Sequence, residues 1–148
     1  MDTLSVAISV ISLGSAISKA VIAITGFITD VSDAKSDLDK VSRELASLQG
    51  SIEALKDLNE NPALRALNIP RALKHNLHMV LGNCMKDVRA VERLLHRLRS
   101  AGLWGRIEWT NSGRTEMNRL RSSLESNKMS LGISIGMINL YVFLGVVR

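Results

Sequence analysis

The sequence predicts an all-α protein, an antiparallel four-helix bundle with long helices. Only 3% of its 148 residues are aromatic and two are proline, whereas sheets need aromatic and β-branched strands with frequent turns. Apolar residues recur at intervals of three and four, the period of an α-helix. With 46% hydrophobic residues, one domain with one core is expected. The expected helices cover about residues 3–29, 31–59, 69–100 and 112–147, with room for a short extra helix between the last two.

The first expected helix is long and almost free of charge. Of the 25 residues from Leu4 to Ile28, sixteen are apolar and Lys19 alone is charged. As a helix this segment measures about 38 Å, more than the roughly 30 Å of a bilayer's hydrocarbon core. The chain opens with Met1 and Asp2 instead of basic residues, and the apolar run is too long for a signal peptide. The segment is therefore expected to remain in the mature protein.

The second and third expected helices are amphipathic. In residues 34–55 the apolar positions alternate at spacings of four and three, with polar residues between them. Pro62 ends this helix because proline cannot continue the hydrogen-bond ladder. Pro70 suits the first turn of the next helix, whose apolar stripe covers residues 69–98. Each helix is expected to turn this stripe toward the core.

The middle of the chain carries most of the positive charge. Residues 31–60 have a net charge of −3 and residues 61–100 one of +6. Two interpretations fit the bases of the third helix: pairing with the acidic second helix, which is favoured because the signs are complementary, or binding to anionic lipid headgroups. Nucleic acid fits less well, because no aromatic residues lie between the bases and zinc-ligand spacing is missing. The bases assigned to headgroups are Lys86, Arg89, Arg93 and Arg97.

The fourth expected helix changes character halfway along. Residues 114–128 include six charged side chains, whereas the nineteen residues 129–147 include none. Nineteen uncharged residues are again enough to span a bilayer. The simplest soluble packing places this segment and the first helix in the centre, wrapped by the two amphipathic helices. A membrane-length helix would then be hidden inside a water-soluble fold.

Small residues recur at intervals of four in both apolar helices. Gly132 and Gly136 form one such pair, and Gly14, Ser18 and Gly26 are spaced by multiples of four. This spacing lets two helix backbones approach closely. Two uses fit: packing between helices of the folded bundle, which is favoured, or a seam between copies in a lipid-embedded oligomer.

Three further residues bear on a membrane function. Lys19 either reaches the surface of the folded bundle or, in a spanning helix, faces a pore lumen or the interface, because a charge at the bilayer midplane is costly. Trp104 and Trp109 bracket the connection before the last helix. Either they plug the open end of the bundle, which is the commoner use, or they form an interfacial belt.

The sequence contains no motif that indicates catalysis. It contains no glycine-rich phosphate loop and no nucleophile elbow. His75 and His78 lack further residues at metal-ligand spacing, and Cys84 lies on the core stripe as a small hydrophobe. A lone cysteine also fits a reducing compartment. Neither an enzyme activity nor catalytic, cofactor-binding or metal-binding residues are expected.

Several stretches of the sequence resemble one family. They are residues 1–7 (MDTLSVA), 33–48 (DAKSDLDKVSRELASL) and 124–131 (LESNKMSL), with Trp109, Glu116 and Leu120. In these stretches, which are spread over nearly the whole chain, the sequence resembles the HeLo-like N-terminal domain of fungal NOD-like (STAND) receptors and cell-death effectors. The resemblance implies a helical bundle that executes regulated cell death in innate immunity and heterokaryon incompatibility.

The resemblance also implies a mechanism. In that family a nucleotide-binding receptor module or an amyloid-forming segment gathers the domains into an oligomer, whose apolar N-terminal helices permeabilise the plasma membrane as pores. The chain contains neither module, so an upstream NOD-like receptor or amyloid partner is expected, with the domain cytoplasmic when inactive and at the plasma membrane when active. The alternative is a non-lytic adaptor that only oligomerises. The residues matched to the inserting helix are Leu4, Ile8, Ile11, Leu13, Ile17, Lys19, Val21, Ile24, Phe27 and Ile28.

Overall fold

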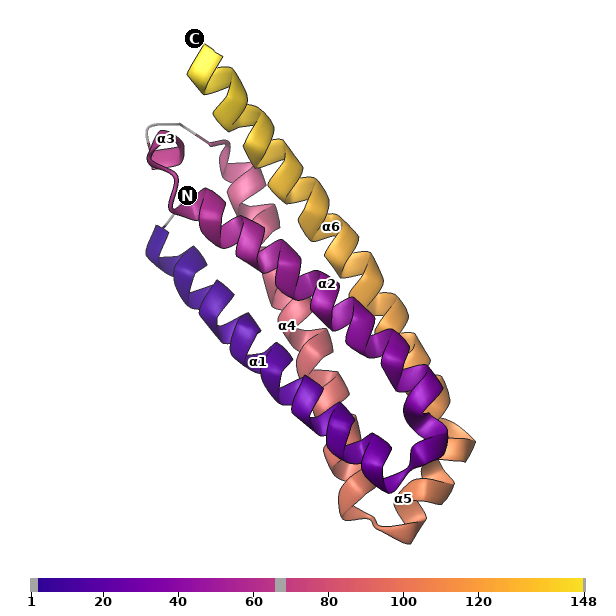
Figure 1. Cartoon of the computed structure of the whole chain (residues 1–148). Helices are drawn as coiled ribbons and strands as arrows, with labels where there is room; N and C mark the ends of the chain where they lie inside the picture. The colour runs from indigo at the N-terminus through magenta and orange to yellow at the C-terminus, as the bar shows by residue number, and fades with distance from the viewer. Residues whose placement is uncertain (1–2, 66–68, 148) are drawn as a thin grey trace.

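The structure is an antiparallel bundle of four long helices (Figure 1). It is a computed structural model that describes residues 3–65 and 69–147, and the side chains of residues 5–64 and 69–145. The long helices are α1 (Thr3–Asp30), α2 (Lys35–Asn59), α4 (Arg71–Ser100) and α6 (Arg114–Val147). The short elements are η1 (Ser32–Ala34), α3 (Pro62–Arg65), α5 (Leu103–Glu108) and η2 (Trp109–Gly113). The predicted all-α class, the four-helix bundle and the short helix between the last two long helices are confirmed.

The helix bounds follow local sequence signals. The largest departure from the prediction is the start of α2, at Lys35, because residues 32–34 form a 3₁₀ turn. Pro62 begins α3 and Pro70 directly precedes α4, positions where no helical N–H is lost. After α4, Gly102 has a φ of +60° and a ψ of −124°, a backbone conformation that glycine adopts readily because it has no Cβ.

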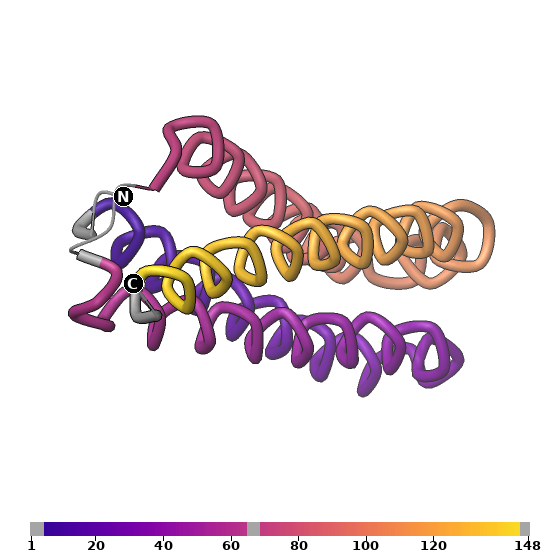
Figure 2. Tube along the Cα trace, turned by 90° about the horizontal axis from the view of Figure 1, so that it is seen from above, coloured from indigo at the N-terminus to yellow at the C-terminus, as the bar shows by residue number. Residues whose placement is uncertain are grey.

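The four long helices alternate around the bundle. α1 packs on α2 and α4, and α6 packs on the same two helices, so α1 and α6 lie at opposite corners, as do α2 and α4. The start of α1 and the end of α6 lie at one end of the bundle and α5 at the other (Figure 1, Figure 2). The last turns of α6 extend beyond the other helices (Figure 1).

The predicted apolar stripes of α2 and α4 form much of the core. All the apolar residues assigned to these stripes are buried. In α2 they are Leu38, Val41, Leu45, Leu48, Ile52 and Leu55, and in α4 Leu73, Leu77, Val80, Cys84, Val88, Val91, Leu95 and Leu98. α1 and α6 each add one buried stripe to the same core.

The predicted central position of the two apolar helices is wrong. α2 and α4 do not wrap around α1 and α6, because four helices of similar length joined in sequence pack side by side and each can bury only one stripe. Ile11 and Ile22 of α1 are each 71% exposed, and Ile133 of α6 is 64% exposed. The two apolar segments thus present isoleucine side chains to solvent instead of being hidden.

Candidate membrane-binding surfaces

α1 has one apolar face and, opposite it, a face on which isoleucines alternate with serines and threonines. Its buried face repeats at spacings of four and three and comprises Val6, Val10, Leu13, Ile17, Ala20, Ile24 and Phe27. Its exposed face repeats at spacings of three and four and comprises Ile8, Ile11, Ser15, Ser18, Ile22, Thr25 and Thr29. Ile8, Ile11 and Ile22 are thus left in water, although α1 is long and apolar enough to cross a bilayer. In the bundle, protein covers only one side of α1.

The residues matched to an inserting helix divide between these two faces. Leu13, Ile17, Ile24 and Phe27 lie in the core. Ile28 is half-buried, and Ile8, Ile11, Lys19 and Val21 are exposed. Leu4 lies outside the side chains that the structure describes. The matched residues therefore lie on one helix, but four of them pack in the core of the bundle.

Lys19 lies on the surface of the bundle, as expected for the folded state. It lines a shallow depression of about 350 Å³ between α1 and α4, together with Ser12 and Ser15 of α1 and Arg89 and Glu92 of α4. Ile11 lines the same depression, so the only charge of the Leu4–Ile28 segment lies on the exposed side of α1 among serines and an isoleucine.

The C-terminal half of α6 presents a second apolar face. The exposed residues on it include Met129, Ile133, Leu140, Phe143 and Leu144. Gly132 and Gly136 lie among them, and a Cβ added at either glycine would meet no atom within 4 Å. The favoured prediction that these two glycines pack against another helix of the bundle is wrong, because the apolar side chains around them turn outward. A seam between copies at these glycines stays a prediction.

The small residues of α1 have different surroundings. Gly14 faces α2, where an added Cβ would lie 3.8 Å from Cδ1 of Ile52, an ordinary contact. Ser18 is exposed. At Gly26 an added Cβ would collide with the guanidinium of Arg99, so this glycine leaves room for a side chain of α4. Packing within the bundle thus accounts for Gly26.

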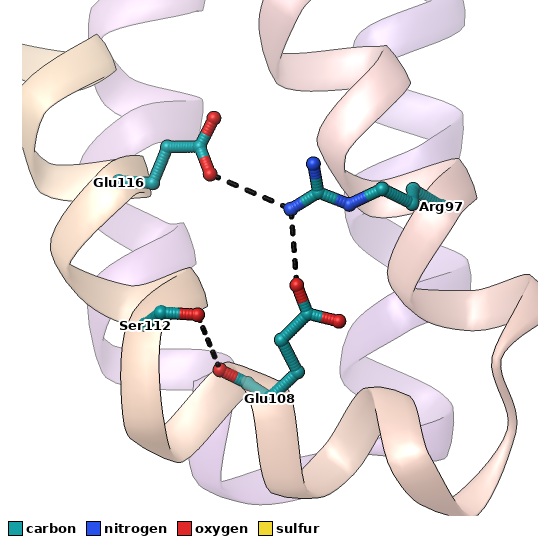
Figure 3. A network of polar contacts seen from close by, with 4 residues as sticks. All are labelled: Arg97, Glu108, Ser112 and Glu116. Atoms are coloured by element: carbon teal, nitrogen blue, oxygen red, sulfur yellow. Dashed lines mark hydrogen bonds and ion pairs between the residues drawn. The ribbon is translucent and has the colours of Figure 1, made fainter.

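Three of the four bases assigned to headgroups form an exposed row on α4. Lys86, Arg89 and Arg93 are spaced by three and four residues and exposed, and no carboxylate within the described part of the chain forms an ion pair with them. Arg97 differs, because its Nη2 lies 3.2 Å from Oε1 of Glu108 and 3.5 Å from Oε2 of Glu116 (Figure 3). Two acids therefore neutralise one end of the row.

The favoured pairing of the α4 bases with acidic α2 is wrong. α2 and α4 lie at opposite corners of the bundle, and no ion pair joins them within the described part of the chain. Two acids of α2 pair with α6 instead: Nε of Arg114 lies 3.0 Å from Oδ2 of Asp37, and Nζ of Lys128 lies 2.7 Å from Oε2 of Glu44. This arrangement leaves the row of bases open to an anionic partner.

The two tryptophans have opposite surroundings. Trp109 lies in the π-helical turn η2, is 1% exposed, and packs its ring 5.4 Å from that of Phe27, centroid to centroid. It closes the end of the bundle, as the favoured interpretation predicted. Trp104 does not share this role, because its side chain is 75% exposed on α5. An interfacial position for Trp104 stays a prediction.

A buried polar cluster, which no sequence motif predicted, joins α4 to α6. Asp87 accepts hydrogen bonds from Oγ of Ser123 at 2.8 Å and from Nδ2 of Asn127 at 2.6 Å. Cys84, one turn away, is fully buried, and burial first, then the charge of Asp87, raises the pKa of its thiol to about 12. The thiol therefore stays protonated at neutral pH, which suits the predicted core position.

Two helical segments are long and apolar enough to cross a membrane, judged by length and composition alone. They are Ser5–Asp30 and Leu103–Gly145. In the most apolar part of each segment, 33% and 28% of the residues, respectively, are buried inside the bundle. Within the described residues there is no group of three or more His, Cys, Asp or Glu that could hold a metal ion. Comparisons with known protein families, curated proteins and solved structures find no match to the chain.

Proposed function

We propose that this chain is a membrane-permeabilising domain in which α1 exchanges its place in the bundle for a place in a lipid bilayer. The observation that supports it is that α1, long and apolar enough to cross a bilayer, buries only one face in the bundle and leaves Ile8, Ile11 and Ile22 exposed to water. The resemblance to HeLo-like cell-death domains points to the same function.

If α1 leaves the bundle, transfer into lipid costs less free energy than release into water. Leaving the bundle uncovers six large apolar side chains, each worth roughly 1.5–3 kcal/mol when buried, so release into water costs on the order of 10 kcal/mol or more. These side chains are Val6, Val10, Leu13, Ile17, Ile24 and Phe27. In a bilayer they leave water again and the exposed isoleucines do so for the first time. A membrane therefore shifts the population toward the released helix.

Lys19 favours an oligomer over a single copy as the membrane-inserted state of α1. It lies three residues from the middle of the Leu4–Ile28 segment, where a charge costs about 2.5–3.5 kcal/mol in a spanning helix. Ser12 and Ser15 lie on the same side. When several copies turn this side toward a shared water-filled lumen, the ammonium keeps its hydration. The faces of α2 and α4 that α1 leaves uncovered gain new partners in the same assembly.

The function is tested by release of dye from vesicles that contain phosphatidylserine. Buried Ile17 and Ile24 are unsuitable targets, because aspartate there would unfold the bundle. Ile11→Asp with Ile22→Asp changes two exposed positions of α1 instead. The fold should persist, whereas each charge adds about 2.5–3.5 kcal/mol to insertion, so release should fall at least a hundredfold.

The matched control is Ala46→Asp with Ala54→Asp, two exposed positions of α2. It introduces the same charge into a helix that has no place in the bilayer, so it should release dye as the wild type does. Circular dichroism checks that all three proteins are folded. Release that survives the α1 changes would remove α1 from the mechanism, and a folded wild type that assembles without releasing dye would favour the adaptor alternative.

A further inference from the structure

We propose that α4 and α6 form a binding site for a molecule that carries both a primary amine and a phosphate group, as a soluble compound or as a phospholipid headgroup. The site, called the α4–α6 depression, has a volume of about 370 Å³, at the lower end of the roughly 300–1,000 Å³ typical of ligand pockets. Its polar and charged lining residues are Asn83, Lys86 and Asp87 of α4 and Arg119, Ser123 and Asn127 of α6. None of the lining residues belongs to α1, so the inference does not depend on the release of that helix.

The most buried charged group of the depression is Asp87, which is 8% exposed. Ser123 and Asn127 both donate to the same carboxylate oxygen, Oδ2, at 2.8 and 2.6 Å. Within the described part of the chain no hydrogen bond reaches Oδ1, and no cation lies within ion-pair distance of the carboxylate. A buried charge without a partner is costly. A cationic donor on a bound molecule would therefore stabilise Oδ1.

Two cations line the same depression, Lys86 on α4 and Arg119 on α6. Both are exposed, and neither forms an ion pair with any residue that the structure describes. Lys86 and Asp87 leave α4 in different directions, because neighbouring residues of a helix point about 100° apart. Further along the same two helices a cation does pair across them, since Nη2 of Arg97 lies 3.5 Å from Oε2 of Glu116 (Figure 3). The cations of the depression leave its carboxylate unpaired.

This arrangement of charges selects the class of ligand. A simple anion between Lys86 and Arg119 would also meet the carboxylate of Asp87, and a metal cation or a simple amine at Asp87 would meet two positive side chains. A molecule with an amine at one end and an anion at the other can satisfy all three groups. Arginine and lysine bind phosphate in proteins, and a phosphate has enough oxygens to accept from both helices at once.

A primary amine fits the depression better than a quaternary ammonium. Oδ1 of Asp87 can accept a hydrogen bond, which an –NH₃⁺ group donates and a trimethylammonium group cannot. Proteins hold quaternary ammonium groups in cages of aromatic rings, and none of the described residues around the depression is aromatic. The ligand class is therefore an amino-phosphate such as phosphoethanolamine, which is also the headgroup chemistry of phosphatidylethanolamine.

A nuclear magnetic resonance titration of the full chain tests the site. The probes are phosphoethanolamine, phosphocholine, which has no N–H donor, and β-alanine, which has a carboxylate in place of the phosphate. Phosphoethanolamine should shift the amide signals of residues 83–90 and 119–127. The other two probes should bind at least about tenfold more weakly, because each loses charge-assisted hydrogen bonds at one end of the site.

Two variants separate the ends of the site. Asp87→Asn keeps an oxygen that accepts the hydrogen bonds from α6 but removes the charge, so it should lose the preference for phosphoethanolamine over phosphocholine. Lys86→Gln with Arg119→Gln should weaken the binding of both phosphates at least about tenfold. The matched control is Lys40→Gln with Lys56→Gln, two exposed lysines of α2 outside the depression, which should bind as the wild type does.

Unshifted signals around the depression would overturn the inference, as would equal binding of phosphocholine or β-alanine by the wild type. So would unchanged binding by the Lys86→Gln, Arg119→Gln protein, in which both changes are exposed and the fold should persist. Flotation with phosphatidylcholine vesicles, with and without phosphatidylethanolamine, identifies the source. Binding to phosphatidylethanolamine that soluble phosphoethanolamine displaces assigns the site to a lipid headgroup, whereas binding of the free probe without such a preference assigns it to a soluble compound.

Discussion

At the residue scale, the buried thiol of Cys84 connects core packing to the stability of the fold. Its pKa is raised from 9.0 to about 12 in the folded protein. Below pH 9 both states keep the proton, and above it the unfolded state loses the proton first. The free energy of unfolding should therefore fall by about 1.4 kcal/mol for each pH unit between these values.

Urea unfolding at pH 9 and pH 10 checks the Cys84 effect, with Cys84→Ala as the reference that carries every other titration of the chain. The difference in free energy of unfolding between wild type and variant should shrink as the pH rises. A difference that stays constant would show that the folded thiol ionises as easily as the unfolded one.

The burial of individual residues was predicted correctly where the helical spacing of apolar residues alone determines it. The apolar stripes of α2 and α4 could be read from spacings of three and four, because their opposite faces are polar. Asp87 could not be placed in this way. Its burial depends on Ser123 and Asn127, which lie 36 and 40 positions away, and only the packing of α4 on α6 brings them to it.

At the element scale, the sequence predicted α1 as a long apolar helix, but the prediction named no buried face. Its two repeats differ in polarity: one is wholly apolar, and the other combines three isoleucines with two serines and two threonines. The bundle buries the side with Leu13, Ile17 and Phe27 and leaves outside the side on which Ile alternates with Ser and Thr. The bulkier and less polar repeat fills the core better.

The contact between α1 and the end of the bundle offers a reporter of helix release. Phe27 of α1 packs on Trp109, and the chain has one other tryptophan, Trp104, which is exposed. In Trp104→Phe, Trp109 is the sole tryptophan and should resist quenching by acrylamide in solution. If α1 leaves, vesicles containing phosphatidylserine should remove this protection and the near-ultraviolet dichroism of the packed ring.

The same measurement in the Ile11→Asp, Ile22→Asp background serves as the control, because a helix that cannot insert should leave Trp109 protected. Dye release with unchanged Trp109 protection in the otherwise wild-type protein would mean that the end of α1 stays seated. Permeabilisation would then have to come from another element.

At the scale of the whole molecule, the pairing of helices decides where charge remains free. The sequence predicted an acidic α2 and a basic α4 but paired them wrongly, because side chains alone do not give the order of helices around a bundle. With α2 opposite α4, the acids Asp37 and Glu44 neutralise α6. The surplus positive charge of the chain, +5 in total, is therefore displayed in part along α4.

This distribution of charge predicts how binding to membranes depends on salt. Reversing Lys86→Glu and Arg93→Glu removes two exposed bases from the α4 row, each worth about 1 kcal/mol near an anionic surface. Affinity for vesicles with phosphatidylserine should fall more than about tenfold at low salt, and the gap to wild type should close as salt screens the field. Lys40→Glu with Lys56→Glu makes the same change in net charge on α2, across the bundle. If both variants lose affinity equally in flotation assays at low and high salt, net charge alone attracts the protein; if only the α4 variant loses it, the order of the helices has built a basic face.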